Sequence, residues 1–203
     1  MADQLIAMSF DDGPDTTTGD LLAILKDLRV YASFFLCGGH VRAYTQAARA
    51  IVAGGHETGN HSYDHTRMDG LDEGAVRGNF ERAAGAIFEI TGRKPSFIRV
   101  PYMSYGEAVF KAAADMNMPV IGCDVIGYDW EETADTARIV QNVLAAAKDG
   151  GIILLHEPYA KTRAALPPIV NTLRSRGYDI TTVGALAAQK QITLKAGVCY
   201  NAL

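Results

Sequence analysis

Short strand-like segments alternate with stretches of helical periodicity, and this alternation limits the possible folds more than any other feature of the sequence. Seven segments, most of them apolar, predict strands at residues 5–10, 31–37, 57–59, 97–99, 119–123, 151–155 and 178–183. Six stretches predict helices at about residues 18–28, 42–53, 72–91, 106–116, 134–148 and 163–176, with a short helix after the last strand. Strands and helices in this order favour a parallel sheet covered by helices.

The predicted fold is therefore α/β, a small and incomplete (β/α) barrel of about seven parallel strands. The chain has 203 residues, of which 48% are hydrophobic, so it can bury one core of ordinary size. No internal repeat, linker or low-complexity stretch divides the sequence. We expect residues 1–203 to form a single domain, whose last long helix is interrupted early by Pro167 and Pro168.

The charge balance argues against two classes of partner. The chain carries 19 basic and 23 acidic residues, a formal net charge of −4, and no block of Lys or Arg. Nucleic acid and anionic membrane surfaces are therefore not expected as partners. No stretch approaches the roughly 20 apolar residues of a membrane helix. A neutral or cationic polymer fits this charge better.

The cysteines are too few and too scattered for a disulfide framework or a cysteine-based zinc site. Cys37 and Cys123 stand in apolar surroundings, so we expect them to be buried as small hydrophobic residues. Cys199 lies in the C-terminal tail, and the sequence leaves its role open.

Residues capable of catalysis follow several of the predicted strands. They are Asp11, Asp12, His61, Arg99 and His156, each at or just beyond the end of a strand-like segment. In parallel α/β folds the carboxyl ends of the strands share one face, where sites form. These residues, from separate parts of the chain, are therefore expected to converge.

Asp11 and Asp12 are adjacent carboxylates in a turn. Adjacent side chains on an extended backbone point in opposite directions, so both can serve one site only if the chain bends there. Gly13-Pro14 is expected to supply the bend. Taken alone, the stretch favours a solvated turn, since Asp, Gly and Pro are ordinary turn residues.

His61 and His65 are four residues apart, a spacing that places both on one face of a helix and allows both to bind one zinc ion. Ser62 stands where the zincin motif has its catalytic Glu, so that motif is excluded. Two His and one carboxylate form a recognised catalytic metal set, and Asp12 is the natural third ligand. The other histidines, His40 and His56, are expected to be framework residues.

Five segments resemble, in order, the motifs of polysaccharide deacetylases of the NodB-homology type, carbohydrate esterase family 4. They are Ser9-Phe10-Asp11-Asp12-Gly13-Pro14, His61-Ser62-Tyr63-Asp64-His65, Arg99-Val100-Pro101-Tyr102, Asp129-Trp130 and Leu154-Leu155-His156. Gly55-His56-Glu57-Thr58-Gly59-Asn60 matches the usual lead-in to the second motif. Any one of these motifs would be a weak signal, but together they form a strong one.

The resemblance implies a distorted barrel of the NodB type and hydrolytic removal of acetyl groups from glycans. It implies that Asp12, His61 and His65 bind one divalent metal ion, usually zinc, with cobalt or nickel as alternatives. Asp11 would be the catalytic base and His156 the catalytic acid. Taken alone, His156 would read equally as an ordinary residue at a strand end.

The resemblance also assigns residues around the acetyl group. Arg99 would pair with Asp11, although alone it would read as a surface ion-pair residue. The backbone amide of Tyr102 would help to bind the oxyanion. Trp130 and Leu154 would wall the acetyl pocket, and Pro101 would join the substrate-binding residues. In isolation, Trp130 would read as a core aromatic.

The sequence departs from the family pattern in two places. Met103 stands where the family often has Gly, and Ile126 stands where the fourth motif commonly has Asp. Asp129 therefore becomes the candidate that orients His156, with Asp124 in reserve.

Aromatic side chains are frequent in the predicted site loops. They are Tyr102, Tyr105, Tyr128 and Trp130. Aromatic faces offer platforms for sugar rings, since they bury apolar area at modest entropy cost. For Tyr105 and Tyr128, ordinary packing is an equal alternative.

We expect a metal-dependent esterase or deacetylase that removes O-acetyl groups from acetylxylan, with chitin oligosaccharides or peptidoglycan as N-acetyl alternatives. A non-catalytic carbohydrate-binding domain and an amidase of small molecules are the competing hypotheses. The expected state is a monomer, acting alone or as a domain of a larger glycan-degrading protein. The sequence shows no signal peptide, which fits either a cytoplasmic protein or a mature or excised domain of an exported one. With a polysaccharide substrate, the localisation expected is extracellular, as a mature or excised domain.

Overall fold

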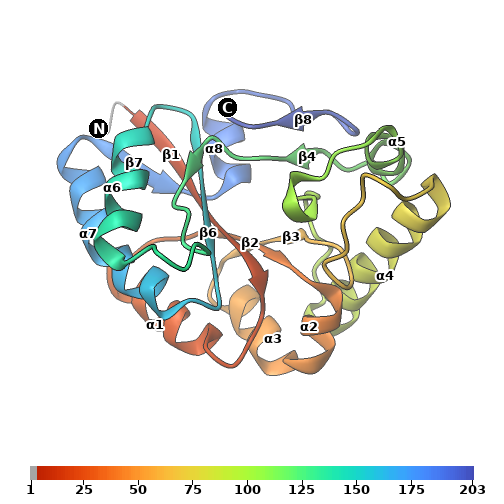
Figure 1. Ribbon diagram of the computed structural model, residues 1–203, viewed down its shortest axis with the longest axis horizontal. Helices are drawn as coiled ribbons and strands as arrows, with labels where there is room; N and C mark the ends of the chain where they lie inside the picture. Colours follow the sequence, from red (N-terminus) through yellow and green to blue (C-terminus); the bar gives the residue numbers. More distant parts are fainter. Residues whose placement is uncertain (1–3) are drawn as a thin grey trace.

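A parallel sheet forms the centre of the computed structural model, which describes residues 4–203 (Figure 1). Its strands are β1 (Gln4–Gly13), β2 (Ser33–Leu36), β3 (Glu57–Asn60), β5 (Val125–Ile126), β6 (Gly151–His156) and β7 (Tyr178–Thr181). They pair in the order β3-β2-β1-β6-β5, and β7 also pairs with β1. All these pairings are parallel, so the carboxyl ends of the strands lie at one edge.

A second, shorter pairing extends the curve of the sheet without closing it. β4 (Val120–Ile121) pairs in parallel with β8 (Cys199–Tyr200). Ile98 connects the two parts of the barrel, because it forms single parallel bridges to Asn60 at the end of β3 and to Val120 in β4. The parallel strands and the helices between them confirm the predicted α/β class.

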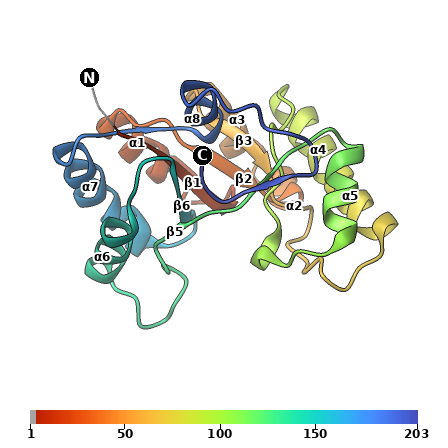
Figure 2. The ribbon, with the colours of Figure 1, turned by 90° about the horizontal axis from the view of Figure 1, so that it is seen from above.

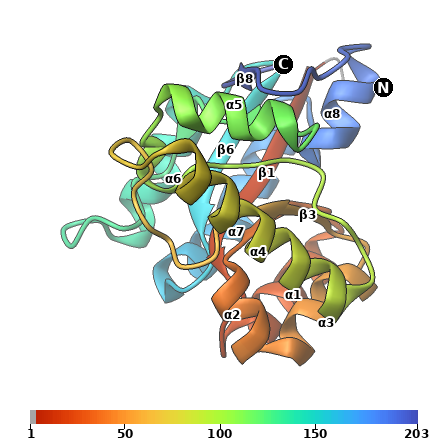
Figure 3. The same ribbon diagram turned by 90° about the vertical axis from the view of Figure 1, so that its right-hand side faces the viewer.

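Helices surround these strands, as Figure 2 shows from above. They are α1 (Thr18–Leu28), α2 (Gly38–Ala43), α3 (Thr45–Ala53), α4 (Glu73–Thr91), α5 (Glu107–Asp115), α6 (Thr136–Ala146), α7 (Ala160–Ser175) and α8 (Val183–Gln189). A short 3-10 helix spans Pro101–Met103. The start of β1 and the C-terminus lie at the same end of the molecule (Figure 3). No helix within residues 4–203 combines the length and the apolar character needed to cross a membrane.

The core follows directly from the apolar runs. The interior of β1 and β6 is buried along almost its whole length, as expected for strands covered on both faces. The helices add one apolar stripe each; in α1 the buried residues include Leu21 and Leu25, one helical turn apart. Asp72, at the start of α4, and Asp135, at the start of α6, accept hydrogen bonds from backbone N–H groups of the first helical turn.

Several predictions of individual helices and strands were wrong. The helix expected at 42–53 is two helices, α2 and α3, separated at Tyr44. The strand expected at 97–99 is reduced to the bridges of Ile98. The helix expected at 163–176 begins at Ala160 and continues through both prolines, because its buried side chains pack into the core on either side of them. The two-residue strands β5 and β8 were not predicted.

Candidate active site

Asp11 and Asp12 are brought to one site by an irregularity at the end of β1. The pairing of β1 with β2 shifts register between Phe10 and Gly13, and Asp12 has a left-handed φ of 72°. A bulge of this kind turns a side chain to the other face of a strand. The predicted bend therefore exists, but it lies at Asp12 and not at Gly13-Pro14, where the peptide bond is cis.

Gly13 is required by a close contact at the same turn. A Cβ atom at this position would lie 1.7 Å from Oε2 of Glu157. Glu157 is fully buried, accepts a hydrogen bond from the Thr18 hydroxyl and donates its backbone N–H to the carbonyl of Asp11 at 3.1 Å. Burial raises the pKa of Glu157 to about 7. This carboxyl group thus packs directly beneath the turn that carries both aspartates.

Asp11 forms a buried ion pair with Arg99, as predicted. Nη1 of Arg99 donates to Oδ1 of Asp11 at 2.8 Å, and the pair is almost completely shielded from solvent. Nη1 also donates to the Ser9 hydroxyl, Nε and Nη2 donate to the carbonyls of Ile121 and Gly122, and the guanidinium lies 3.9 Å from the centre of the Phe35 ring. A buried charge with a hydrogen bond on each of its three nitrogens is fixed in position, so Arg99 is not a surface ion-pair residue.

His61 and His65 lie in a loop and not on a helix, so the helical geometry expected for this pair was wrong. Ser62 and His65 have left-handed φ values of 67° and 58°. The loop is held by side-chain amides and hydroxyls: Asn60 accepts from the N–H of Ser62, and the Ser62 hydroxyl accepts from the N–H of His65. The two rings still converge, with their centres 5.0 Å apart.

Asp12, His61 and His65 form a cluster whose possible ligand atoms all lie within 4.8 Å of one another. Nε2 of His65 is 3.0 Å from Oδ1 of Asp12, and Nε2 of His61 is 3.4 Å from it. Two ligands of one tetrahedral zinc ion, each about 2.0–2.1 Å from the metal, would be roughly 3.3 Å apart. The spacing of the cluster therefore fits a shared divalent cation.

The hydrogen bonds of His61 independently support a cation at this cluster. Its Nδ1 lies 2.8 Å from the carbonyl oxygen of Arg99, which can only accept, so Nδ1 carries the proton. In the neutral ring, Nε2 then directs a lone pair towards the Asp12 carboxylate. Oδ1 of Asp12 is buried and accepts no hydrogen bond of good geometry from residues 4–203. Facing acceptor atoms need a proton or a cation between them, and this donor set suits a metal ion.

Without a cation the same groups would perturb one another. Burial alone would raise the pKa of Asp12, but the imidazoles of His61 and His65 outweigh it and hold this pKa below its ordinary value. Burial lowers the pKa of His61, whereas the carboxylates of Asp11 and Asp12 raise it, and the net change is upward. The cluster is thus arranged to hold positive charge.

His156 ends β6 on the other side of the cluster and contacts Asp129. Its Nδ1 lies 2.7 Å from Oδ1 of Asp129, and its backbone N–H donates to Oδ2 at 2.7 Å. Burial lowers the pKa of His156, but the hydrogen bond to Asp129 raises it, and the net change is upward. Asp124 instead accepts from the N–H of Ile152 and pairs with Lys148, so Asp129 and not Asp124 contacts His156.

The cluster opens into a cavity of about 640 Å³. Its lining includes all the predicted catalytic and metal-binding side chains except Arg99 and Asp129, which lie behind it, and includes Tyr102, Trp130 and Leu154. Five further lining residues were not among the predicted site residues: Val100, Met103, Cys123, Ile126 and Tyr159. Pro101 is buried and does not belong to the lining, so it supports the Tyr102 turn without facing the cavity. Tyr105 packs away from the cavity on Phe110.

Residues that position the site were the hardest to find from sequence. The hydroxyl of Thr162 donates to Oδ2 of Asp129 at 2.5 Å, and Nδ1 of His40 lies 2.8 Å from the carbonyl oxygen of Asp12. His56 lies outside the metal cluster and accepts a hydrogen bond from the N–H of Ala32, in keeping with a framework role. No spacing rule marks Thr162, because it contacts Asp129 across 33 positions of sequence.

Comparison with known protein families agrees with the site described above. The family described as polysaccharide deacetylase matches residues 1–121, more than half of the chain. The chain belongs to this family. The bifunctional xylanase/deacetylase of Pseudobutyrivibrio xylanivorans is 35% identical over 192 residues, which cover 93% of this chain and 31% of that protein. Other relatives of this chain are named as peptidoglycan and chitin deacetylases. The chain spans about a third of the length of the first curated relatives that it matches.

Solved structures of polysaccharide deacetylases have the same fold. One is the family 4 domain of a multidomain xylanase from the hindgut metagenome of Trinervitermes trinervoides, with a TM-score of 0.92, 33% identity and coverage of 98% of this chain and 97% of that one. Another is a family 4 acetyl xylan esterase from Clostridium thermocellum in complex with a cobalt ion, with a TM-score of 0.92, 29% identity and coverage of 98% and 99%. A family pseudoenzyme from Bacillus anthracis is also similar.

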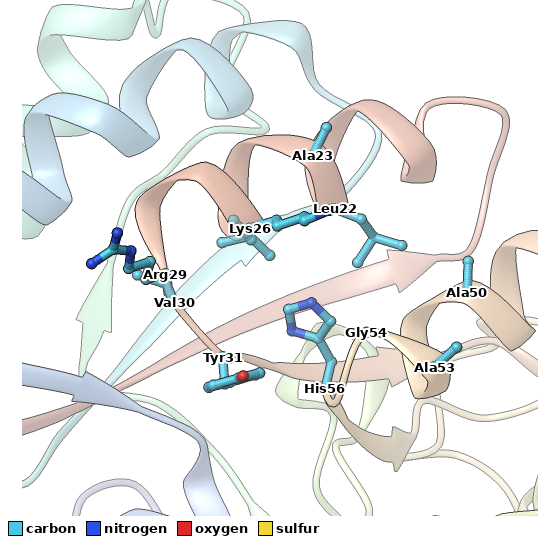
Figure 4. Close-up of a pocket in the computed structure, with 11 residues that line it drawn as sticks. Leu22, Ala23, Lys26, Arg29, Val30, Tyr31, Ala50, Ala53, Gly54 and His56 are labelled. Carbon is cyan, nitrogen blue, oxygen red and sulfur yellow. The ribbon is translucent and has the colours of Figure 1, made fainter.

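The protein also has a second cavity, at the amino ends of β2 and β3. It measures about 510 Å³ and lies between α1 and α3 (Figure 4). Leu22 and Lys26 line it from α1, Ala50 and Ala53 line it from α3, and the His56 ring lies between them. No carboxylate lines it, and it contains none of the residues of the metal cluster.

Proposed function

We propose that the chain is a metal-dependent deacetylase that removes O-acetyl groups from acetylxylan. One observation carries the proposal: the cluster of Asp12, His61 and His65 lies in the same cavity as the carboxylate of Asp11 and the imidazole of His156. Ester hydrolysis needs a base for the attacking water, stabilisation of the oxyanion and an acid for the leaving group. The cavity offers a group for each task.

Each side chain can be given a role from its contacts. A divalent cation held by Asp12, His61 and His65, with zinc preferred and cobalt or nickel as alternatives, would polarise the acetyl carbonyl and make water more acidic. Asp11, fixed by Arg99, takes the proton of the attacking water. His156, fixed by Asp129, gives a proton to the departing sugar oxygen.

The oxyanion is assigned to the backbone amide of Tyr102. This residue has a left-handed φ of 58°, which turns its peptide unit relative to the residues that precede it. Within residues 4–203 its N–H donates to no protein acceptor, so it remains available to substrate. A single donor of this kind can be worth about 2.7–4 kcal/mol in the transition state.

The substrate assignment rests on the walls of the cavity. Tyr102, Tyr128 and Trp130 are 61%, 41% and 42% exposed, large fractions for aromatic residues. Exposed rings of this kind suit stacking against the pyranose rings of a polymer. Several relatives and neighbours carry xylan in their names, which favours acetylxylan, and we place N-acetylated chitin oligosaccharides and peptidoglycan second. A xylan substrate would place the protein outside the cell, acting alone or as one domain of a larger protein.

A non-catalytic carbohydrate-binding role is the second candidate, since the fold is shared with a pseudoenzyme. The structure gives a reason to rank it lower. Asp11 and His156 are each held by a buried partner, Arg99 and Asp129, and burying such charges is costly. A surface that only binds glycans has no need of that arrangement.

The test is acetate release from acetylated xylan and from acetylated glucosamine oligomers, before and after treatment with a chelator. We expect release from xylan, its loss in the stripped protein and its recovery on adding zinc or cobalt, with the circular dichroism spectrum unchanged throughout. Release from the glucosamine oligomers alone would overturn the substrate. Binding of glycan without any turnover, even after metal is added, would support the binding role.

A further inference from the structure

Asp129 is held by three donors, and one of them belongs to no motif. Its Oδ1 faces Nδ1 of His156 at 2.7 Å, and its Oδ2 accepts from the backbone N–H of His156 at 2.7 Å and from the hydroxyl of Thr162 at 2.5 Å. Asp129 and Thr162 are both completely buried. The carboxylate is therefore hydrogen-bonded on both oxygens inside a dry environment.

We propose that Thr162 is a positioning residue for catalysis, which fixes the Asp129 carboxylate and through it the direction in which His156 presents Nε2 to the leaving group. The inference rests on the proposed function, because it concerns the same hydrolytic step. It goes beyond that function by adding a residue from helix α7 to the acid side of the site.

The geometry explains why two contacts from His156 are not sufficient. One of them comes from the His156 ring, which is the group to be oriented, so only the backbone N–H at the end of β6 ties the carboxylate to the core, through Oδ2 alone. Thr162 belongs to the first turn of α7, and its backbone N–H donates to the carbonyl of Tyr159 at 3.1 Å. Its hydroxyl therefore ties the Asp129–His156 pair to a helix packed into the core.

The neighbouring residue of α7 supports the same arrangement. Arg163 donates to the hydroxyl of Thr17 at 2.9 Å and to the backbone carbonyl of Glu157 at 3.3 Å. The first turn of α7 thus contacts both Asp129, the hydrogen-bond partner of His156, and Glu157, the residue that follows His156. Trp130 and Tyr159 approach the His156 ring edge-to-face, with ring centres 5.0 and 6.1 Å away, and restrict its tilt.

The proton that His156 gives to the leaving group is the one on Nε2. In the hydrolytic step, the bond from the acetyl carbon to the sugar oxygen breaks, and that oxygen takes the Nε2 proton of the imidazolium, leaving neutral His156. Asp129 keeps the other proton on Nδ1 throughout. If the carboxylate rotates, the ring follows it, and the Nε2 proton no longer points at the leaving oxygen.

The experiment compares two esters that differ in their need for an acid. Acetylated xylooligosaccharides have a poor leaving group, whereas an activated aryl acetate leaves without a proton. For Thr162→Val we expect kcat on the sugar ester to fall about 10-fold, part of the 10²–10⁴-fold that a general acid supplies. We expect the aryl acetate rate and the metal affinity to stay close to those of wild type. Thr162→Ser, which keeps the hydroxyl, should restore the sugar ester rate.

The matched control is Thr91→Val, which removes a hydroxyl bonded to the carbonyl of Ile87 in α4, away from the cavity. It should leave both rates unchanged. An equal loss on both esters for Thr162→Val would show a general structural role and overturn the inference, as would no loss on either.

A second measurement needs no turnover. The Nδ1 proton of His156, hydrogen-bonded to Asp129, should give a separate downfield signal in the proton NMR spectrum, assigned by its absence in Asp129→Asn. We expect this signal to shift or broaden in Thr162→Val and to be retained in Thr162→Ser. An unchanged signal would contradict the inference even if the wild-type protein hydrolysed no acetyl ester, an outcome that would separately refute the proposed function.

Discussion

The two ends of the parallel sheet are built on different principles. At the carboxyl end, carboxylates and imidazoles face one cavity, and the buried guanidinium of Arg99 lies behind them. At the amino end, the cavity between α1 and α3 is lined mainly by aliphatic side chains and by His56 (Figure 4). The two cavities are similar in size, about 640 and 510 Å³, so size does not distinguish them.

Backbone conformation separates the two ends more clearly. Among residues 4–203, nine non-glycine residues have left-handed φ values, and six of them belong to the site: Asp12, Ser62, His65, Tyr102, Met103 and Tyr128. The other three, Arg29, Asn117 and Gln191, follow the ends of α1, α5 and α8. Sparsely populated conformations cost about 1–3 kcal/mol each, so their concentration at one end indicates that positioning there outweighs local stability.

This contrast indicates that the residues important for catalysis and those important only for stability lie at opposite ends of the sheet. Substitutions at the carboxyl end should change turnover or metal affinity more than folding. Substitutions at the amino end should change folding and leave turnover alone. The following predictions test the division, beginning with the largest expected effect.

Asp11→Asn should lower kcat on acetylxylan by about 10²–10⁴-fold, because an amide cannot take the proton of the attacking water. The variant should still bind one metal ion, since Asp12, His61 and His65 are unchanged. Steady-state kinetics and metal stoichiometry are the measurements. Asp124→Asn is the matched control, because Asp124 also follows a strand but contacts only Lys148 and the N–H of Ile152. Loss of metal in Asp11→Asn would mean that the two aspartates have exchanged roles.

Tyr102→Phe should weaken metal binding by about 10-fold, the lower end of the effect of removing a partner of a metal-bound histidine. The Tyr102 hydroxyl lies 3.1 Å from Nδ1 of His65, so it holds the ring whose Nε2 faces Asp12. Competition with a metal-binding dye gives the affinity. Tyr128→Phe is the control, an exposed tyrosine of the same cavity without a contact to the cluster. Equal affinities in the two variants would remove Tyr102 from the metal site.

His56→Gln should alter stability in a way that depends on pH and should leave turnover unchanged. Burial lowers the pKa of His56 from 6.5 to about 4, and its Nδ1 accepts from the N–H of Ala32, which requires the neutral ring. A lowered pKa gives stability that is complete above pH 6.5 and is lost as the pH falls towards 4. The difference in unfolding free energy between wild type and variant, measured with urea, should therefore shrink over this interval. A difference in unfolding free energy that stays constant over this pH interval would contradict the prediction.

The sequence predicted the fold well where apolar runs are long. The β1 and β6 segments are continuous apolar runs, and the residues that follow them, Asp11 and His156, lie where parallel strands must place them. The short strands β5 and β8 escaped prediction because two residues carry no periodicity. Their formation depends on neighbouring strands that are distant in sequence.

The site was predictable as a set of residues but not as a geometry. Spacing alone suggested a helix for His61 and His65, whereas the side chains of Asn60 and Ser62 hold a loop that brings the rings together by another path. The turn at Asp12 depends on a register shift against β2, which no local pattern encodes. Thr162 could not be predicted either, because its importance depends on a contact with Asp129, which lies 33 positions away in the sequence.

Trp130 has a practical consequence for anyone who studies this protein. It is the only tryptophan in the chain, and its ring lies 5.0 Å from that of His156 at the mouth of the cavity. Its intrinsic fluorescence therefore reports from one place only. Protonation of the adjacent imidazole, or a sugar ring laid over the indole, should change the emission directly, so occupancy of the cavity can be followed optically in the unlabelled protein.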